Sequence, residues 1–357
     1  MNREDIFKYN EPLKKEIDKE FIFSVIGLAH GHIYGMVQGL LNEGENVKIK
    51  YVFDEDKTLV ENFLNKYPQA KYEEDTDKII SDSETKLIVS AAIPSTRAEI
   101  GIKSMKNGKD YFVDKAPMIS LKQLEEVQKV SAETKRKYIV YYCESIDNDS
   151  AIYARDLIKR NVIGKVFSVF GAAPHRLNIE TRPYWFFDKA YTGGIITDLI
   201  CHQIHQFLDF ANADDCEVNF ARSANFHHKE KPGMDDFGDV MVTADNGAVA
   251  HLRVDWFSPG GINTWGDSRM FIEGTEGYIE LRKNCNIGSD SKPDHVFVAT
   301  EEKVFYNNVN GKSANVFFNN LINDCIYRTD TAINPVRSFN AIKAAITAQN
   351  MADGIIE

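Results

Sequence analysis

The sequence predicts an α/β protein whose N-terminal part forms a doubly wound parallel sheet and whose C-terminal part is an α+β region with a large, mostly antiparallel sheet. Short apolar runs alternate with amphipathic stretches between residues 22 and 142, which is typical of strand–helix crossover units. After about residue 145, strand candidates follow one another through short turns, which indicates antiparallel pairing. The 357 residues suit two domains, at roughly 150 residues for each.

The composition and charge of the chain indicate an ordinary globular protein. Apolar residues make up 43% of the sequence and charged residues 27%. No apolar run approaches the roughly 18 residues of a membrane-spanning helix, and the charged N-terminal stretch lacks the apolar centre of a signal peptide. The net charge of −11 argues against nucleic-acid partners, because such binding depends on clustered lysine and arginine. We therefore expect a cytoplasmic protein that contacts neither nucleic acid nor membrane.

The cysteines do not form a metal-binding or disulfide pattern. Their number is odd, their spacing is wide and no C-x-x-C pair occurs, so we expect reduced thiols. The five residues are Cys143, Cys201, Cys216, Cys285 and Cys325.

The elements of the first half alternate regularly. Because β-branched and aromatic residues dominate the apolar runs, these runs are expected to be buried strands of a parallel sheet with both faces covered by helices. Gly108 in KNGKD is expected to end a helix in the left-handed conformation. Strands are predicted at 21–27, 48–54, 86–94, 110–115 and 137–143, and helices at 33–43, 57–67, 96–107 and 120–134.

The second half has a different rhythm. The Asn246–Gly247 pair lies between two alternating runs, as in a tight hairpin. Helices are predicted at 150–161, 194–210, 313–327 and 335–352, and strands at 165–173, 217–226, 237–244, 248–257, 269–273, 276–282 and 295–305.

The stretch FSVIGLAHGHIYGM resembles a dinucleotide-binding turn in a modified form. Such a turn has the pattern G-x-G-x-x-G between a first strand and its helix, with an acidic residue about 20 positions later. Gly27 takes the first position, Ala29 the second and His32 the third, and Asp54 ends the next predicted strand. A carboxylate there binds ribose hydroxyls and repels a 2′-phosphate, which favours NAD over NADP. The alternative for Asp54 is a surface turn residue.

His30 and His32 admit three interpretations. A metal site needs further ligands, and the neighbouring sequence offers none. Residues of a binding loop near cofactor or substrate are a better interpretation for both, and a solvated loop position is the simplest one for His30. We therefore predict no metal.

Lys115 ends the predicted strand of YFVDKAPM, at the edge of a parallel sheet where ligands bind. Its ammonium group is suited to hold a substrate oxygen and to stabilise negative charge on it. The alternative is an ordinary solvated lysine at a strand end.

A second candidate constellation lies in YTGGIITDLICHQIHQFLDF. Asp198, His202 and His205 follow one another at four and three residues, so on one helix they share a face. A histidine is suited to accept the proton of an alcohol, and a nearby carboxylate can orient its ring. A buried polar cluster and a three-ligand metal site are the alternatives.

Taken together, these motifs resemble the Gfo/Idh/MocA family of oxidoreductases. The resemblance runs from Phe21 onward and includes the nucleotide turn, IPSTRAEIGIKSMKNGKDYFVDKAP, the GG-x3-D-x3-H pattern at 193–202 and EGTEGYIEL. It implies a Rossmann domain followed by an α/β domain with a large open sheet, and it implies dimers or tetramers formed through that sheet.

The resemblance also implies roles for single residues. Lys115 matches the lysine of the family's E-K-P motif, and Pro94 matches a proline that flanks the cofactor. Asp198 and His202 match the family's D-x3-H pair, whose histidine is the acid/base.

The chain departs from the family pattern in three places. D-K-A-P replaces E-K-P, so the cis bond typical of the family is expected at Ala116–Pro117 instead. Ala29 replaces a loop glycine. His205 replaces an aspartate that binds a sugar hydroxyl, which suits an acidic or differently oxidised substrate. Other candidates for the substrate pocket are Arg176, Arg182 and Trp185, the last with core packing as an equal alternative.

We therefore expect an NAD(P)-dependent dehydrogenase acting on a CH–OH group of a sugar, inositol or polyol derivative. The alternatives are a regulatory protein that binds a dinucleotide without catalysis, and an NAD-dependent glycoside hydrolase using Tyr184 or Tyr191. The expected organisation is an arm over 1–20, a dinucleotide-binding domain over 21–145, and a substrate-binding and oligomerisation domain over 146–357. Its C-terminal helices are candidates to pack back on the first domain.

Overall fold

The computed structural model describes residues 7, 9–288 and 292–355, and the chain divides into two compact units. The first, called here the parallel-sheet unit, comprises Leu13–Tyr141 and Val316–Ser338. The second, the antiparallel-sheet unit, comprises the described residues of Met1–Pro12, Tyr142–Asn315 and Phe339–Glu357. No described helix is long and apolar enough to cross a membrane.

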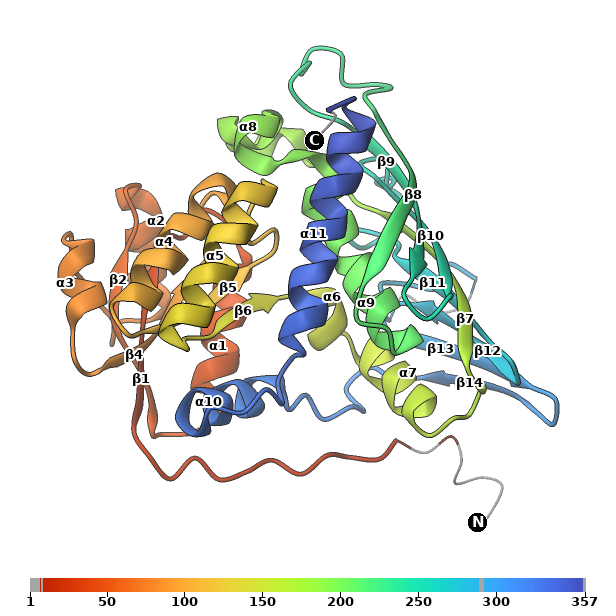
Figure 1. Ribbon diagram of the computed structural model, residues 1–357, viewed down its shortest axis with the longest axis horizontal. Coiled ribbons are helices and arrows are strands. Elements are labelled where there is room, and N and C mark those ends of the chain that lie inside the picture. The colour runs from red at the N-terminus through yellow and green to blue at the C-terminus, as the bar shows by residue number, and fades with distance from the viewer. Residues whose placement is uncertain (1–6, 8, 289–291, 356–357) are drawn as a thin grey trace. The chain divides into compact units, whose positions relative to one another are not determined.

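The parallel-sheet unit contains a six-stranded sheet in the order β3-β2-β1-β4-β5-β6, with every neighbouring pair parallel (Figure 1). The chain order reverses between β1 and β4, and in open α/β sheets this switch point is where ligands bind. The predicted Rossmann-type sheet is therefore confirmed. Its strands are β1 (Phe21–Ile26), β2 (Val47–Phe53), β3 (Lys71–Tyr72), β4 (Thr85–Ser90), β5 (Asp110–Asp114) and β6 (Tyr138–Tyr141).

Two helices of this unit pack closely against each other. Gly39 of α1 approaches the ring of Phe318 of α10 so closely that a Cβ atom would lie 2.2 Å from it, so only glycine allows this contact. Gly108 has φ +75° after α4, as predicted for a helix end. The helices are α1 (His32–Leu41), α2 (Lys57–Lys66), α3 (Thr76–Ser81), α4 (Pro94–Lys106), α5 (Leu121–Thr134) and α10 (Phe317–Tyr327).

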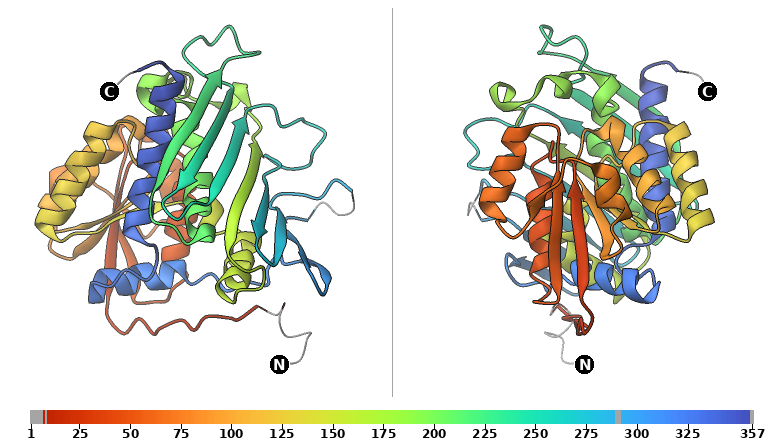
Figure 2. Two further views of the ribbon diagram at one scale, coloured as in Figure 1. Left: turned by 45° about the vertical axis from the view of Figure 1, so that its right-hand side comes forward. Right: turned by 90° about the vertical axis from the view of Figure 1, so that its left-hand side faces the viewer.

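The antiparallel-sheet unit contains an eight-stranded sheet in the order β14-β13-β12-β11-β7-β10-β9-β8 (Figure 2). Only β7 and β10 pair in parallel, and all other neighbours are antiparallel, as predicted. The strands are β7 (Val166–Pro174), β8 (Cys216–Ala224), β9 (Phe237–Ala244), β10 (Val249–Asp255), β11 (Arg269–Gly274), β12 (Gly277–Arg282), β13 (His295–Thr300) and β14 (Val304–Asn308).

The two faces of this sheet differ. Helices α7 and α9 contact one face, and along β10 the residues alternate between buried and partly exposed positions, which is the pattern of a sheet covered on one side. On the open face, Phe170 of β7 lies opposite His251 of β10, and His251 lies opposite Met241 of β9. The helices of the unit are α6 (Cys143–Ile146), α7 (Asp149–Lys159), α8 (Lys189–Thr192), α9 (Cys201–Ala211) and, from Phe339 onward, α11 (Pro335–Ala352).

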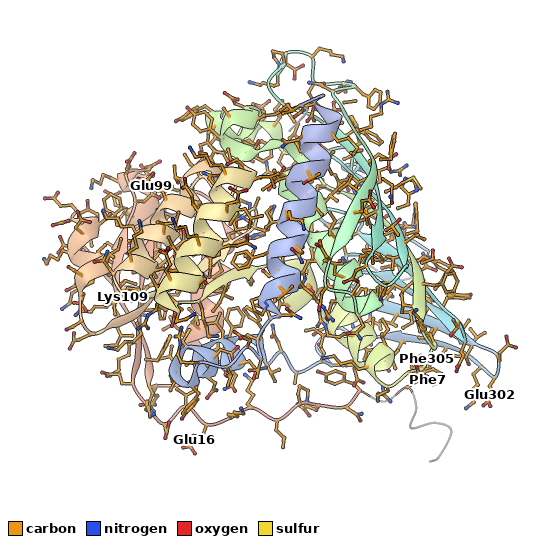
Figure 3. All side chains as sticks on the ribbon, viewed as in Figure 1. Phe7, Glu16, Glu99, Lys109, Glu302 and Phe305 are labelled. Atoms are coloured by element: carbon orange, nitrogen blue, oxygen red, sulfur yellow. The ribbon has the colours of Figure 1, made fainter. Side chains whose placement is uncertain are left out.

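Sequence patterns missed several short elements and one strand break. The strand predicted over 295–305 is two strands, β13 and β14, joined by a turn. The elements α3, β3, α6 and α8 are too short to show a periodic pattern. Near the N-terminus, Phe7 stacks on Phe305 of β14 with ring centroids 4.7 Å apart (Figure 3).

Candidate active site

The dinucleotide turn begins at Gly27, directly after β1. Gly27 has φ +96°, and a Cβ atom here would lie 2.4 Å from the Cβ atom of Ala92, so both the conformation and the space require glycine. The N–H of Gly27 donates to the carbonyl of Phe53 at 2.9 Å, and its own carbonyl accepts from the N–H of Ala91 at 3.1 Å. The turn is therefore held between the ends of β2 and β4, at the switch point of the sheet.

Asp54 closes this turn from the end of β2. Its carboxylate accepts hydrogen bonds from the backbone N–H of Leu28 at 2.6 Å and of Asp56 at 2.9 Å. The side chain is half-buried, and a carboxylate has about four acceptor positions, so it retains capacity for ribose hydroxyls. Ala29 lies half-buried in the turn, ahead of the N-terminus of α1. These features fit a bound dinucleotide, whose diphosphate is favoured at a helix N-terminus.

His30 and His32 meet the carboxylate of Asp114, which is the last residue of β5. The Nδ1 atom of His30 lies 3.2 Å from one carboxylate oxygen, and Nδ1 of His32 lies 2.8 Å from the other. The two rings contact edge to face with centroids 4.2 Å apart. The guanidinium of Arg97, which is 1% exposed, lies 3.1 Å from the same carboxylate. The cluster therefore joins the start of α1 to the end of β5.

The charges of this cluster are strongly coupled. Burial alone would raise the pKa of Asp114, but His32, Arg97 and His30 hold that pKa well below its usual range. Burial and the neighbouring His32 lower the pKa of His30 to about 4. At neutral pH Asp114 is thus ionised and His30 is neutral.

The fold supplies a possible metal ligand that the neighbouring sequence lacks. The ligand atoms of His30, His32 and Asp114 all lie within 4.8 Å of one another. However, Arg97 already places a positive charge on this carboxylate, and Lys115 follows it directly in the chain. A cation would therefore bind there less favourably than at a carboxylate that faces no other positive charge. The interpretation of His30 as a solvated residue is wrong, since its side chain is only 26% exposed.

Lys115 is buried rather than solvated, with 5% exposure, so the alternative of an ordinary surface lysine is wrong. Arg97 holds the backbone around it by donating hydrogen bonds to the carbonyl oxygens of Asp114 at 3.1 Å, of Lys115, and of Ala116 at 3.0 Å. The cis peptide bond is Lys115–Ala116, so the expectation of a cis bond at Ala116–Pro117 is wrong. Pro94 occupies the first position of α4 and is buried.

The helix predicted over 194–210 is not uniform. Residues Ile196–Ile200 form a π-helical turn, and the α-helix α9 begins only at Cys201. Asp198 lies in the π-helical turn and His202 in α9. A π-helical turn has hydrogen bonds from residue i to i+5, so the four-residue spacing does not place both side chains on one α-helical face. The expectation of a single regular helix is wrong here.

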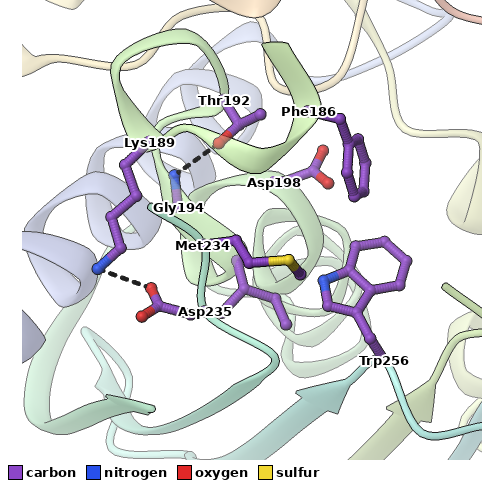
Figure 4. A pocket seen from close by; sticks show the side chains of 9 residues that line it. Phe186, Lys189, Thr192, Gly194, Asp198, Met234, Asp235 and Trp256 are labelled. Carbon is purple, nitrogen blue, oxygen red and sulfur yellow. Dashed lines mark hydrogen bonds and ion pairs between the residues drawn. The ribbon is translucent and has the colours of Figure 1, made fainter. Parts of the chain in front are cut away.

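Asp198 lies in a pocket with aromatic walls. Figure 4 shows its carboxylate beside the ring of Phe186, with Trp256 across the pocket. The guanidinium of Arg182 stacks on Phe186 at 4.4 Å and on Trp256 at 5.4 Å from the ring centroids. Burial lowers the pKa of Arg182, and the negative charge of Asp198 opposes that change. The pocket is lined by Phe186, Lys189, Thr192, Gly194, Ile195, Asp198, Met234, Asp235 and Trp256.

His202 and His205 are buried side chains of α9, with exposures of 2% and 6%. The Nε2 atom of His202 lies 3.9 Å from the Sγ atom of Cys143. The ring of His205 stacks on Tyr142 with centroids 4.4 Å apart. Burial alone would raise the pKa of the Asp209 carboxylate, but Arg155 and His205 hold that pKa below its usual value. His205 thus contacts Tyr142 and interacts electrostatically with Asp209.

Two of the predicted pocket residues have structural contacts. Arg176 donates hydrogen bonds to the carbonyl oxygens of Ile262 and Pro259, the latter at 3.2 Å. Trp185 is 7% exposed and packs near Phe186 with ring centroids 6.2 Å apart, which favours the packing interpretation.

Arg97 and Asp114 organise the surroundings of Lys115, and neither was predicted as a site residue from the sequence. Arg97 is an ordinary residue of an amphipathic helix pattern, and no spacing rule connects it with a strand end 17 positions later. The only available signal was the position of Asp114 immediately before Lys115.

Comparisons with known proteins agree with this geometry. Residues 21–142 match the family model of the oxidoreductase family with an NAD-binding Rossmann fold, and residues 152–280 match the GFO/IDH/MocA C-terminal domain. A solved structure from Erwinia carotovora atroseptica SCRI1043, assigned as an oxidoreductase, is 38% identical, with a TM-score of 0.90 and coverage of 93% of this chain and 98% of that one. The chain belongs to the Gfo/Idh/MocA family of oxidoreductases.

Two curated relatives of the chain are named after polyhydroxylated compounds. The D-xylose dehydrogenase of Paenarthrobacter nicotinovorans is 23% identical over 168 residues, or 45% of this chain. The alignment spans only 43% of that enzyme. The scyllo-inositol 2-dehydrogenase (NAD+) of Bacillus subtilis strain 168 is 25% identical over 263 residues, or 72% of each chain.

Proposed function

We propose that this protein is an NAD-dependent dehydrogenase acting on a secondary alcohol, or the corresponding carbonyl, of a sugar, inositol or related polyol. The observation that carries the proposal is the buried side chain of Lys115, whose backbone Arg97 holds at the carboxyl end of β5, in a chain of an oxidoreductase family. The names of the xylose and inositol dehydrogenases support the substrate class.

We assign the cofactor to the turn around Gly27. The positive φ of Gly27 and the N-terminus of α1 suit a diphosphate, and Asp54 suits two ribose hydroxyls. The negative charge of Asp54 would repel the 2′-phosphate of NADP, which is why we propose NAD. When bound, NAD supplies a nicotinamide ring that takes up the hydride of the substrate carbon.

The chain itself supplies the proton chemistry. We assign Lys115 to hold the reacting oxygen, where its charge stabilises the developing alkoxide. His202 then accepts the hydroxyl proton as general base, because a histidine can change protonation state near neutral pH. The proposal requires Lys115 and His202 to reach the same carbinol group. In the reductive direction the same two side chains act in reverse.

The surroundings of Asp198 suit a hydroxylated ligand. Aromatic walls from Phe186 and Trp256 offer apolar contact, and the Asp198 carboxylate accepts hydrogen bonds from hydroxyl groups. Arg182 adds a cation that would favour a substrate bearing an acidic group. We therefore include sugar acids in the proposed substrate class.

We further propose that two copies associate through the open face of the eight-stranded sheet. One row of paired residues crosses all eight strands of this face, and most of its members are aromatic or apolar. Phe170, Met241 and Phe220 of this row are each more than 40% exposed, which is unusual for a monomer surface. The row consists of Tyr306, Phe297, Glu280, Phe271, Phe170, His251, Met241 and Phe220.

The test is a cofactor titration followed by a substrate panel. Quenching of protein fluorescence on addition of NADH and of NADPH gives both dissociation constants, and we expect NADH to bind more tightly. The protein is then incubated with NAD and a panel of sugars, inositols and sugar acids while absorbance of the reduced nicotinamide is recorded. Turnover of one class supports the proposal, and binding of NADH without turnover of any panel member contradicts it.

A further inference from the structure

A buried ion pair that the proposed chemistry does not use lies beside α9. Glu144 of α6 is 8% exposed and Lys283, which follows β12, is 2% exposed. The ammonium group of Lys283 donates to the Glu144 carboxylate at 2.9 Å and to the side-chain carbonyl of Gln206 at 2.6 Å. The side-chain amide of Gln206 in turn donates to the backbone carbonyl of Glu144 at 2.7 Å. The three side chains thus form a closed network.

This network lies against the part of α9 that carries His202. Gln206 follows His202 by four residues, so both project from one face of the α-helix. Cys143, the neighbour of Glu144 in the chain, places its Sγ atom 3.9 Å from Nε2 of His202. The N-terminal end of α6 is therefore packed against the N-terminal half of α9.

Glu144 retains its charge in these surroundings. Burial alone would raise the pKa of Glu144, but Lys283, His202 and His175 together hold that pKa below its usual range. Nε2 of His175, which follows β7, lies 3.7 Å from the Glu144 carboxylate. The charged or titratable groups that face Glu144 are thus Lys283 after β12, His175 after β7 and His202 on α9. Coulomb interactions are stronger here than in water because the effective dielectric constant is lower.

We propose that Glu144, held in place by Lys283 and Gln206, is a positioning residue that stabilises the protonated ring of His202 more than Asp198 does. Asp198 lies on the preceding π-helical turn, so its side chain does not share the α-helical face of His202. The inference rests on the proposed role of His202 as the proton acceptor. The D-x3-H pattern would give this role to Asp198, whereas the inference gives it to Glu144, which lies outside the pattern.

The test is a pH titration of the histidine side chains by nuclear magnetic resonance, using the full chain without cofactor or substrate. The resonance of His202 is assigned by its loss in His202→Gln. In Glu144→Gln we expect the pKa of His202 to fall by about one unit, because one nearby opposite charge is removed. The conservative variant Glu144→Asp keeps the negative charge, so in it the pKa of His202 should lie close to the wild-type value. In Asp198→Asn the change should be less than half as large.

An Asp198→Asn variant that lowers the pKa of His202 as much as Glu144→Gln, or more, would overturn the inference. If Glu144→Gln does not fold, Asp198→Asn decides the question by comparison with the wild-type chain, because the inference expects it to lower the pKa of His202 by less than about half a unit. In that case a decrease of about half a unit or more contradicts the inference, and a smaller decrease supports it. The titration needs no turnover, so its failure is distinct from a failure of the proposed dehydrogenase activity in the substrate panel.

Discussion

Asp54 accepts a hydrogen bond of 2.6 Å from the backbone N–H of Leu28, so the proposed ribose-binding carboxylate also holds the turn that would receive the diphosphate. One side chain thereby couples two parts of the proposed cofactor site. Substitutions at this position separate the two contributions.

We predict that Asp54→Asn weakens NADH binding roughly tenfold or more, since the amide keeps an acceptor for Leu28 but loses the charged contact to the ribose. NADPH binding should be unchanged or tighter, because the repulsion of its 2′-phosphate is removed. Fluorescence titration with both cofactors measures the ratio. Asp54→Ala also removes the contact to Leu28 and should weaken both. An equal loss for the two cofactors in Asp54→Asn would contradict the ribose assignment.

Lys115→Ala should lower turnover by about 10²–10³-fold while NADH still binds, because the lysine stabilises charge that develops only during the reaction. Steady-state kinetics with the best panel substrate provide the measurement. Lys103→Ala, an exposed lysine paired with Asp77, is the matched control and should retain full activity. Unchanged turnover in Lys115→Ala would remove this residue from the mechanism.

Arg97→Met should lower the free energy of unfolding by about 3–5 kcal/mol, because Asp114 then remains as a buried carboxylate without its cation. Both side chains are almost completely buried, with exposures of 1% and 0%. Urea unfolding measures the change, with the exposed Arg222→Met as control. A loss below about 1 kcal/mol would show that Arg97 does not have the structural role assigned to it.

Stability should fall as the pH decreases from 6.5 towards 4. The pKa of His30 is lowered to about 4 in the fold from 6.5, so within this window the unfolded chain binds a proton that the folded chain excludes. Protonation therefore favours the unfolded chain, and the free energy of unfolding increases as the pH rises from about 4 to 6.5. Urea unfolding at pH 6.5, 5.5 and 4.5 measures the slope. His30→Asn should have a shallower slope, and an identical slope would argue against the contribution of His30.

Phe170→Glu should dissociate the oligomer that we propose, because it places a charge in the centre of the open sheet face. Light scattering coupled to size-exclusion chromatography measures the mass. Phe226→Glu is the control, since Phe226 is also exposed, at 56%, but is outside the eight strands. A wild-type chain that is monomeric at micromolar concentration would contradict the proposal directly.

Long periodic elements were predictable from the sequence, because burial of one stripe or face leaves a regular pattern of apolar residues. The strands β1, β2, β4 and β5 and the helices α2 and α5 lie within a few residues of their predicted positions. The nucleotide turn was predictable for a different reason. The positive φ of residue 27 and its contact with Ala92 require glycine, so the turn leaves a recognisable residue in the sequence.

The surroundings of the site were less predictable, because they depend on contacts between residues far apart in the chain. Arg97 reaches three consecutive carbonyl groups on the far side of a crossover, and Glu144 meets Lys283 across 139 positions. The π-helical turn before α9 also leaves no periodic signal, since it adds a single residue to one turn. A motif thus identifies candidate groups, whereas the fold determines which charges surround them.

The parallel pair β7–β10 divides the large sheet into two meanders with a common border. Strands β8 to β10 form one ribbon and β11 to β14 the other, so β7 is a seam to which both are attached. Gly171 lies in this seam, where a Cβ atom would come within 3.1 Å of Leu252. A larger residue at Gly171 would require the side chain of Leu252 to move, so the space at this glycine affects the border that both ribbons share.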